Sequence, residues 1–364
     1  MSSSDASSAA SLFDPTRLRI ARQAAMIRKK DLAERIGVSA AAVSQYENGT
    51  TSPSPRVVAA LALALGQSAS FFASDRPLGE ATATLAHFRS LRSTTKQERD
   101  RAFAHALLTW ELAQVMQRYV RLPPLDLPGE LSLDPDDPPA AVERAARAAR
   151  QMMGVGEGPV ANVVRLLESR GVVCTRLPAQ TRRVFAFSCE FPERPVVVLS
   201  TERFHRAAGR FDAAHELGHL LMHHDEEPGT HAVERQANVF ASEFLAPTSQ
   251  IADDLPSRGD WKKLLELKEV WGISIQALLY RARSLAVMSE NSYRRAITEL
   301  NARGWRKEEP GDEGRAEQPV LLSKALEVIR DRGTSLDDLS DIARLPVDTI
   351  VSIVAPDERP VLDL

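Results

Sequence analysis

The sequence predicts a mainly α-helical protein with a small β-sheet, arranged as an N-terminal four- to five-helix bundle, an α+β domain and a small C-terminal helical bundle. Two observations support this class. Apolar residues recur every three or four positions through most of the chain, which is the period of amphipathic helices. β-Branched and aromatic residues gather in three short runs, at 171–175, 184–188 and 195–199, and these runs predict three strands.

Composition is that of a soluble globular protein. The 364 residues allow two or three domains, and 43% hydrophobic with 26% charged residues is an ordinary balance. Cys174 and Cys189 fit no CxxC or zinc-finger spacing and are expected to be buried thiols of a reducing cytosol. No apolar run approaches the length of a membrane span, and residues 1–14 are predicted to be a disordered tail rather than a signal peptide. We therefore expect a cytoplasmic protein without membrane contact.

Residues 15–76 carry the pattern of a helix-turn-helix bundle. Gly37 is expected to provide the positive φ of the turn, and Ser39 is a natural N-cap for the second helix. Further helices are expected upstream around 18–25 and downstream over 57–65, where Gly66 ends the helix. Apolar residues occupy the positions that face a core: Leu32, Ile36, Val38, Val43 and Tyr46.

The run Ser39–Gly49, followed by Pro53 and Pro55, resembles the XRE (Cro/repressor) family of DNA-binding domains. The resemblance implies binding to double-stranded operator DNA, usually as a homodimer on paired half-sites. It places four residues of the second helix at the major groove, of which Gln45 offers a bidentate, adenine-reading contact. The other three are Ala40, Ala41 and Ser44.

Charge supports this interpretation. Residues 15–76 contain nine Lys/Arg against four Asp/Glu, a local charge of +5 in a chain that is −3 overall, which favours DNA phosphates. Arg28, Lys29 and Arg56 are the expected phosphate contacts. The alternative is a module kept for protein–protein contact or dimerisation, because Ala40–Ala42 is poor in hydrogen-bonding groups.

Residues 77–139 are expected to form a helical connector and then a proline-rich linker. The stretch 96–120 has the pattern of a long helix that could pair with its copy in a dimer. Prolines and acidic residues at 122–128 and 134–139 mark the clearest domain boundary.

The segment His215-Glu216-Leu217-Gly218-His219 has the residue types and spacing of a metal-binding catalytic motif. On a helix, residues four apart share a face, so His215 and His219 can bind one metal ion. Glu216 then lies beside the open position of the metal, where it can take a proton from bound water. A catalytic zinc needs three protein ligands, so the sequence must supply one more.

Glu234 is the predicted third ligand. It lies near the start of a second amphipathic helix, and Asn238, four residues later, could hydrogen-bond a ligating histidine. Asp225 is a weaker alternative, because the metzincin pattern that would use it also needs a glycine where this chain has Met222. The remaining imidazoles nearby are expected to be solvated or to face substrate: His223, His224 and His231.

His215–His219, Glu234–Ala241 and Phe244–Pro247 resemble the ImmA/IrrE family of metallopeptidases. Members are gluzincin-like zinc proteases that cleave phage-type repressors, so the resemblance implies this fold and activity for residues 140–304. Carried over by residue, His215, His219 and Glu234 become the ligands and Glu216 the general base. The implied cofactor is Zn²⁺, with manganese left open. Gln236 departs from the glutamate of many members and is expected to matter little.

Three further regions lead to expectations. The run 184–188 is a candidate edge strand for binding substrate, although an ordinary core hairpin is an equal alternative. Residues 305–318 are expected to be a hinge. The bundle at 319–364 is acidic, so protein contact is favoured over DNA. His205, His231 and Tyr280 are candidate donors to the oxyanion of the reaction.

Two classes of function follow from the sequence. In the first, a zinc endopeptidase with its own DNA-binding domain cleaves a repressor, such as one of XRE type, or cleaves itself in the linker 122–139, in a stress or mobile-element response. In the second, a transcriptional regulator uses the metallopeptidase-like domain as a sensor or interaction module without proteolysis.

Overall fold

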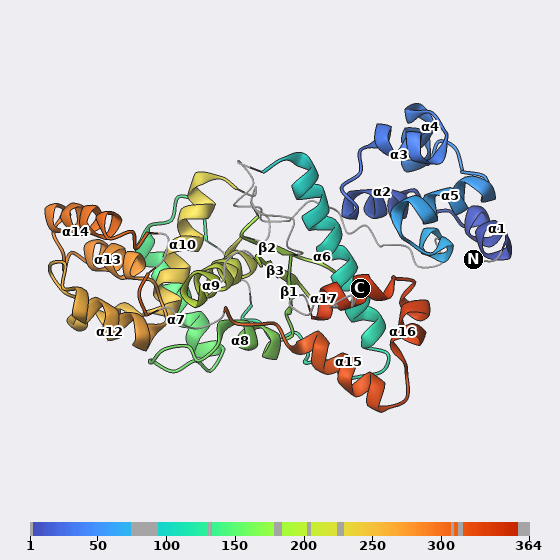
Figure 1. Cartoon of the computed structure of the whole chain (residues 1–364). Helices are drawn as coiled ribbons and strands as arrows, with labels where there is room; N and C mark the ends of the chain where they lie inside the picture. Colours follow the sequence, from blue (N-terminus) through green and yellow to red (C-terminus); the bar gives the residue numbers. More distant parts are fainter. Residues whose placement is uncertain are drawn as a thin grey trace.

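The computed structural model describes residues 3–73, 94–129, 131, 133–177, 184–201, 205–223, 229–306, 309–311 and 316–355. These residues are mainly helical with one three-stranded sheet, as the sequence predicts (Figure 1). The N-terminal elements are α1 (Ser3–Ser11), α2 (Pro15–Ala24), α3 (Lys29–Ile36), α4 (Ala40–Glu47), α5 (Pro55–Leu65) and the 3-10 helix η1 (Ala69–Phe72).

The central elements are α6 (Lys96–Met116), α7 (Pro139–Met152), α8 (Val163–Ser169), β1 (Val173–Arg176), β2 (Ala186–Cys189), β3 (Val196–Leu199), α9 (Arg206–Met222) and α10 (His231–Leu245). The C-terminal elements are α11 (Thr248–Ile251), η4 (Ala252–Asp254), α12 (Trp261–Trp271), α13 (Ile275–Ser284), α14 (Glu290–Ala302), α15 (Leu321–Asp331), α16 (Leu336–Ala343) and α17 (Val347–Val354). Among these described helices, none has the length and apolar character needed to cross a lipid bilayer.

The helix-turn-helix bundle forms as its sequence predicts. Gly37 ends α3 in the left-handed region at φ 69°, and the Ser39 side chain accepts a hydrogen bond from the Ala42 N–H at the start of α4. The disordered tail predicted for residues 1–14 is wrong for most of its length. α1 packs against α5 and η1 with Ala6 and Ala9 buried, because alanine favours helix and its small side chain allows close approach.

The sheet separates two hydrophobic cores. Its strand order is β1-β3-β2, with β1 parallel and β2 antiparallel to β3, and all three strands are buried. Because side chains alternate along a strand, Phe187 joins the core shared with α6 and the N-terminal helices, whereas Ala186 joins the core around α9 and α10. Cys174 and Cys189 are both buried free thiols, as expected.

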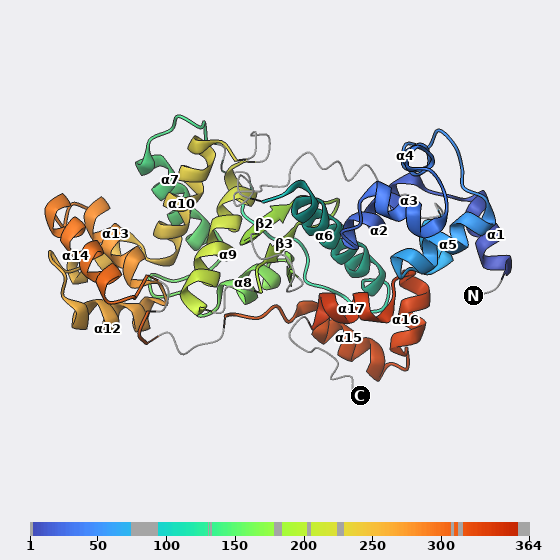
Figure 2. The same cartoon turned by 45° about the horizontal axis from the view of Figure 1, so that its top comes forward.

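The long helix α6 lies at the centre of the first core. It packs against α2, against β1 and β3, and against α15, α16 and α17. Figure 2 shows the N-terminal helices and α15–α17 on the α6 side of the sheet, with α12–α14 at the opposite end. Leu107, Leu112 and Met116 are buried within the chain, so these residues are not available for pairing of this helix with its copy. The apolar face serves the intramolecular core instead.

Two glutamates join the C-terminal helices to the α9 side of the molecule. Glu317 pairs with the buried Arg210 of α9 and accepts the N–H groups of Val163 and Val164 at the start of α8. In return, Glu168 at the end of α8 accepts the N–H groups that precede and begin α15. The described end of the predicted hinge, residues 316–318, is therefore anchored to the body of the protein.

Glu168 is expected to make stability depend on pH. Burial raises its pKa from 4.5 to about 7, although the N–H groups of Leu321 and Val320 act in the opposite direction. The contribution of protonated Glu168 to the stability of the folded protein is complete below pH 4.5 and is lost as the pH rises through about 7. This loss lowers the free energy of unfolding by about 3 kcal/mol. Urea unfolding at pH 5 and pH 8 should show a smaller pH dependence for Glu168→Gln than for wild type. The exposed Glu327 of α15 provides the control, and equal slopes for Glu168→Gln and wild type would contradict the prediction.

Candidate metal centre and DNA-binding face

Helices α9 and α10 meet closely where the candidate ligands lie. The His-x-x-x-His segment occupies the second half of α9, and the Thr230 side chain caps α10 by accepting the Val233 N–H. Gly218 faces Phe240 of α10, where an added Cβ would lie 3.0 Å from a ring carbon. The absence of a side chain at Gly218 therefore lets Glu234 approach the two histidines.

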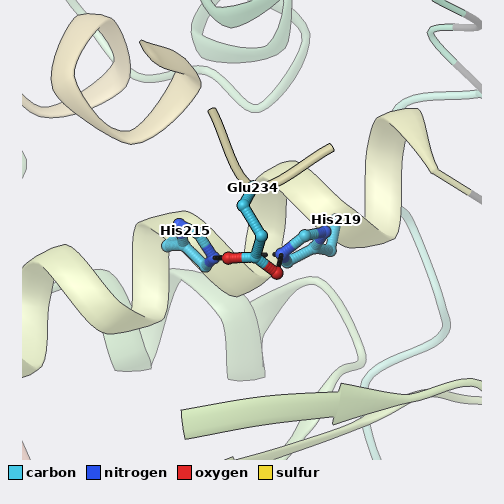
Figure 3. Close-up of side chains that lie close together, drawn as sticks. All are labelled: His215, His219 and Glu234. Atoms are coloured by element: carbon cyan, nitrogen blue, oxygen red, sulfur yellow. Dashed lines mark hydrogen bonds and ion pairs between the residues drawn. The ribbon is translucent and has the colours of Figure 1, made fainter. Parts of the chain in front are cut away.

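His215, His219 and Glu234 converge on one point between the two helices (Figure 3). The Nε2 atoms of the two imidazoles are 3.0 Å apart. The Glu234 carboxylate oxygens lie 3.5 Å from Nε2 of His215 and 3.7 Å from Nε2 of His219. Both histidines are buried, and the Glu234 side chain is 14% exposed.

This triangle has the dimensions of three corners of a tetrahedral zinc site. Zinc–ligand distances of about 2.0–2.1 Å and tetrahedral angles place ligand atoms about 3.3 Å apart. Two Nε2 atoms at 3.0 Å either share a proton in a hydrogen bond or direct both lone pairs at one cation, and the carboxylate adds the negative charge that such a cation needs. The residues present therefore fit a zinc ion.

Glu216 lies beside these residues on the face of α9 that meets the sheet. It is 1% exposed, and its Oε2 accepts a hydrogen bond of 2.8 Å from the Ser188 hydroxyl of β2. Ser188 alternates with Phe187 and so faces α9. The strand thus orients the carboxylate that the sequence predicts as the general base, a contact that no local sequence pattern reveals.

A chain of hydrogen bonds runs away from His219 on the side opposite its Nε2. Its Nδ1 lies 3.0 Å from Nδ1 of His223, whose Nε2 lies 2.9 Å from Oε1 of Gln236. The Gln236 amide donates at 2.7 Å to the carbonyl of Asp134 in the linker. His223 is therefore buried behind the site rather than solvated, and Gln236 is buried beside it, between His223 and the linker.

On the N-terminal bundle, the predicted DNA-reading residues lie on the outer face of α4. Ala40, Ala41 and Gln45 are exposed and Ser44 is half-buried, while Val43 points into the core. Arg28 and Arg56, which precede and begin neighbouring helices, are exposed. The face that could enter a groove is therefore accessible.

Glu47 is a structural residue of this bundle that the sequence reasoning missed. It is 2% exposed and pairs with Arg22 of α2 at 2.5 Å and with Lys29 of α3 at 3.1 Å. Lys29 therefore ties α3 to α4 as well as being a candidate phosphate contact. The available signal was the spacing, because Glu47 follows the buried Val43 by one helical turn.

Both regions match known families. Residues 18–72 match the helix-turn-helix family model, and residues 167–283 match the M78 peptidase model, described as an IrrE N-terminal-like domain. The chain joins these two domains. No curated protein matches the chain.

The IrrE N-terminal-like domain spans the whole candidate metal centre, from the end of α8 to α13. Within it, His231 is exposed at the first position of α10, one turn before Glu234. Asn238 lies one turn after Glu234, and its role beside a histidine remains a prediction. Asp225 and His224 lie outside the described residues.

Proposed function

We propose that this protein is a DNA-binding transcriptional regulator whose IrrE N-terminal-like domain is a zinc-dependent endopeptidase. The observation that carries the proposal is the convergence of His215, His219 and Glu234 at ligand spacing, with a buried Glu216 beside them. The protein substrate is proposed to be a transcriptional repressor, because the fused helix-turn-helix domain brings the enzyme to DNA. Because the helix-turn-helix domain acts on DNA, the protein is proposed to work in the cytoplasm.

The chain supplies the acid–base chemistry and the positioning. Zinc, when bound, would polarise the scissile carbonyl and acidify a water molecule. Glu216 would take the proton of that water and deliver it to the leaving amine. Ser188 would hold the carboxylate in place through its hydrogen bond. His231 is the best supported oxyanion donor, because it lies one turn from Glu234, whereas His205 precedes His215 by about 15 Å of helix.

Substrate is proposed to bind along β2. This strand pairs with β3 on one side and is an edge of the described sheet, and its Ser188 contacts the proposed general base. A polypeptide added along the side of β2 that faces away from β3 would lie beside the strand whose Ser188 contacts Glu216. Phe185, just before β2, is 41% exposed and provides an apolar contact for such a segment.

Cleavage of another molecule is favoured over self-cleavage in the linker. The Leu131 N–H donates to the carbonyl of Leu221, and the Asp134 carbonyl accepts from Gln236. These bonds hold the linker behind His219, on the side of its ring opposite Nε2. A linker peptide bond held there is remote from Glu216.

The proposal is tested by combining a chromatin pull-down with a proteome comparison of cells carrying wild type or Glu216→Gln. Proteolytic regulation predicts a protein that accumulates only with the variant and whose gene targets match the bound promoters. A non-proteolytic regulator is the alternative, and it is favoured by the core that the DNA-binding helices share with α6 and the sheet. Unchanged protein levels and unchanged transcription with Glu216→Gln would support that alternative.

DNA recognition has its own expected result. Gln45→Ala should lower discrimination at one base pair by about 1–3 kcal/mol, because it removes a bidentate base contact. Arg56→Ala should instead weaken binding to all sequences and reduce the salt dependence, because it removes a phosphate contact. Binding titrations on selected operators at two salt concentrations separate these effects. Identical behaviour of both variants and wild type would indicate that the domain serves protein contact. We also propose that the protein binds paired half-sites as a homodimer, and the same titrations give the number of chains bound per operator.

A further inference from the structure

We propose that His223 and Gln236 are positioning residues of the metal centre, and that the linker carbonyl of Asp134 fixes the tautomer of His219 through them. The inference rests on the proposed metal binding by His215, His219 and Glu234. It assigns a role to two buried side chains and to a linker segment that the catalytic chemistry does not use.

The direction of every hydrogen bond in this chain follows from its last member. The Asp134 carbonyl can only accept, so the Gln236 amide must present its NH₂ group there, at 2.7 Å. The Gln236 Oε1 therefore faces His223 Nε2 at 2.9 Å and makes that nitrogen the N–H donor. With one proton on each imidazole ring, the remaining Nδ1 of His223 then accepts from the Nδ1–H of His219 at 3.0 Å.

The result at His219 is the tautomer that a metal site needs. With its proton on Nδ1, the ring has a bare lone pair on Nε2, the atom that faces His215 and Glu234. The opposite tautomer would place a proton where the ion belongs. His219 and His223 are 0% exposed and Gln236 is 2% exposed, so bulk water is kept from these three side chains.

An amide at position 236 does what a carboxylate cannot. Gln236 accepts from His223 and donates to the linker at the same time, whereas a glutamate would present a second acceptor to the Asp134 carbonyl. The linker is also held by the bond from the Leu131 N–H to the Leu221 carbonyl at 2.8 Å. The linker that leads from α6 is therefore part of the support of the metal centre.

The test uses the full-length protein with four variants: Gln236→Leu, Gln236→Glu, His223→Leu, and the double variant with leucine at both positions. Zinc affinity is measured by competition with a chromophoric chelator. Either leucine variant should lower the affinity roughly 10- to 100-fold, the usual effect of removing such a partner. The double variant should lose no more than the larger single loss, because the two residues act in series. Gln250→Leu, which removes a surface hydrogen bond to Glu157, is the matched control and should bind zinc as wild type does.

Gln236→Glu tests the two hydrogen bonds of residue 236 independently of each other. It retains the acceptor for His223, so zinc affinity should stay close to that of wild type. It loses the donor to Asp134, so amide hydrogen exchange at Leu131 should become faster. Nitrogen NMR of the metal-free protein, with His219 assigned by replacement, should show the Nδ1–H tautomer in wild type and a loss of that preference in Gln236→Leu.

Wild-type zinc affinity in both single leucine variants, or an Nε2–H tautomer of His219 in metal-free wild type, would overturn the inference. Additive losses in the double variant would also overturn it. If wild type itself bound no zinc, the proposed enzymatic function would fail, while the tautomer would still decide the role of His223 and Gln236. The tautomer of wild type also decides the question if a leucine variant does not fold.

Discussion

Replacing Glu216 with glutamine is expected to slow cleavage of the protein substrate by roughly 10²- to 10⁴-fold, the usual contribution of a positioned general base. The amide has nearly the same shape as the carboxylate but cannot take a proton from water. Zinc affinity should be retained, because Glu216 is outside the group formed by His215, His219 and Glu234. The rate is measured on the protein that accumulates in cells carrying the variant, using purified components and gel or mass-spectrometric detection of fragments.

The matched control is Glu266→Gln, which makes the same change of charge on the exposed face of α12. It should cleave at the wild-type rate. Full activity of Glu216→Gln would contradict the proposed proteolytic function. Loss of zinc from this variant would show that Glu216 is a ligand rather than the base.

Replacing Glu234 with alanine is expected to lower zinc affinity at least about 100-fold. The change removes one of three protein ligands and the negative charge that offsets the ion, and two imidazoles alone do not complete the site. Chelator competition gives the affinity, and elemental analysis of the purified protein gives the zinc content per chain. Cleavage should fall with the zinc content.

Asp225→Ala is the matched control for this experiment, because Asp225 is the alternative third ligand that the sequence leaves open. Its zinc affinity should equal that of wild type. Retention of zinc by Glu234→Ala together with its loss from Asp225→Ala would reverse the assignment and imply a metzincin-like site.

The candidate ligands were predictable because their geometry is local. Residues four apart on one helix share a face, so His215 and His219 had to lie together once α9 was recognised. Glu234 required one further step, the packing of a second amphipathic helix against the first. In both cases the periodic apolar residues that define the helix also fix the direction of the polar ones.

The surroundings of the site were not predictable in the same way. The roles of His223 and Gln236 depend on a carbonyl in the linker, about 100 residues earlier in the chain, and no spacing encodes that contact. Ser188 reaches Glu216 only because the antiparallel register of β2 against β3 turns its hydroxyl toward α9. Such contacts are set by tertiary packing.

The role of α6 illustrates the same limit at the level of whole helices. Its apolar residues predicted a buried face, and the face is buried. The sequence pattern did not identify the partner, which is the sheet and the flanking helices rather than a second copy of the chain. A hydrophobic pattern predicts that one face of a helix is buried, but it does not identify the elements that bury it.

The central claim, that one zinc ion is bound by two imidazoles and a carboxylate, is tested most directly by the zinc K-edge X-ray absorption spectrum of the full-length protein. The account predicts only nitrogen and oxygen neighbours at about 2.0–2.2 Å, with the outer-shell scattering of two imidazole rings. Sulfur scattering at about 2.3 Å, a single imidazole, or protein that binds no zinc would contradict it.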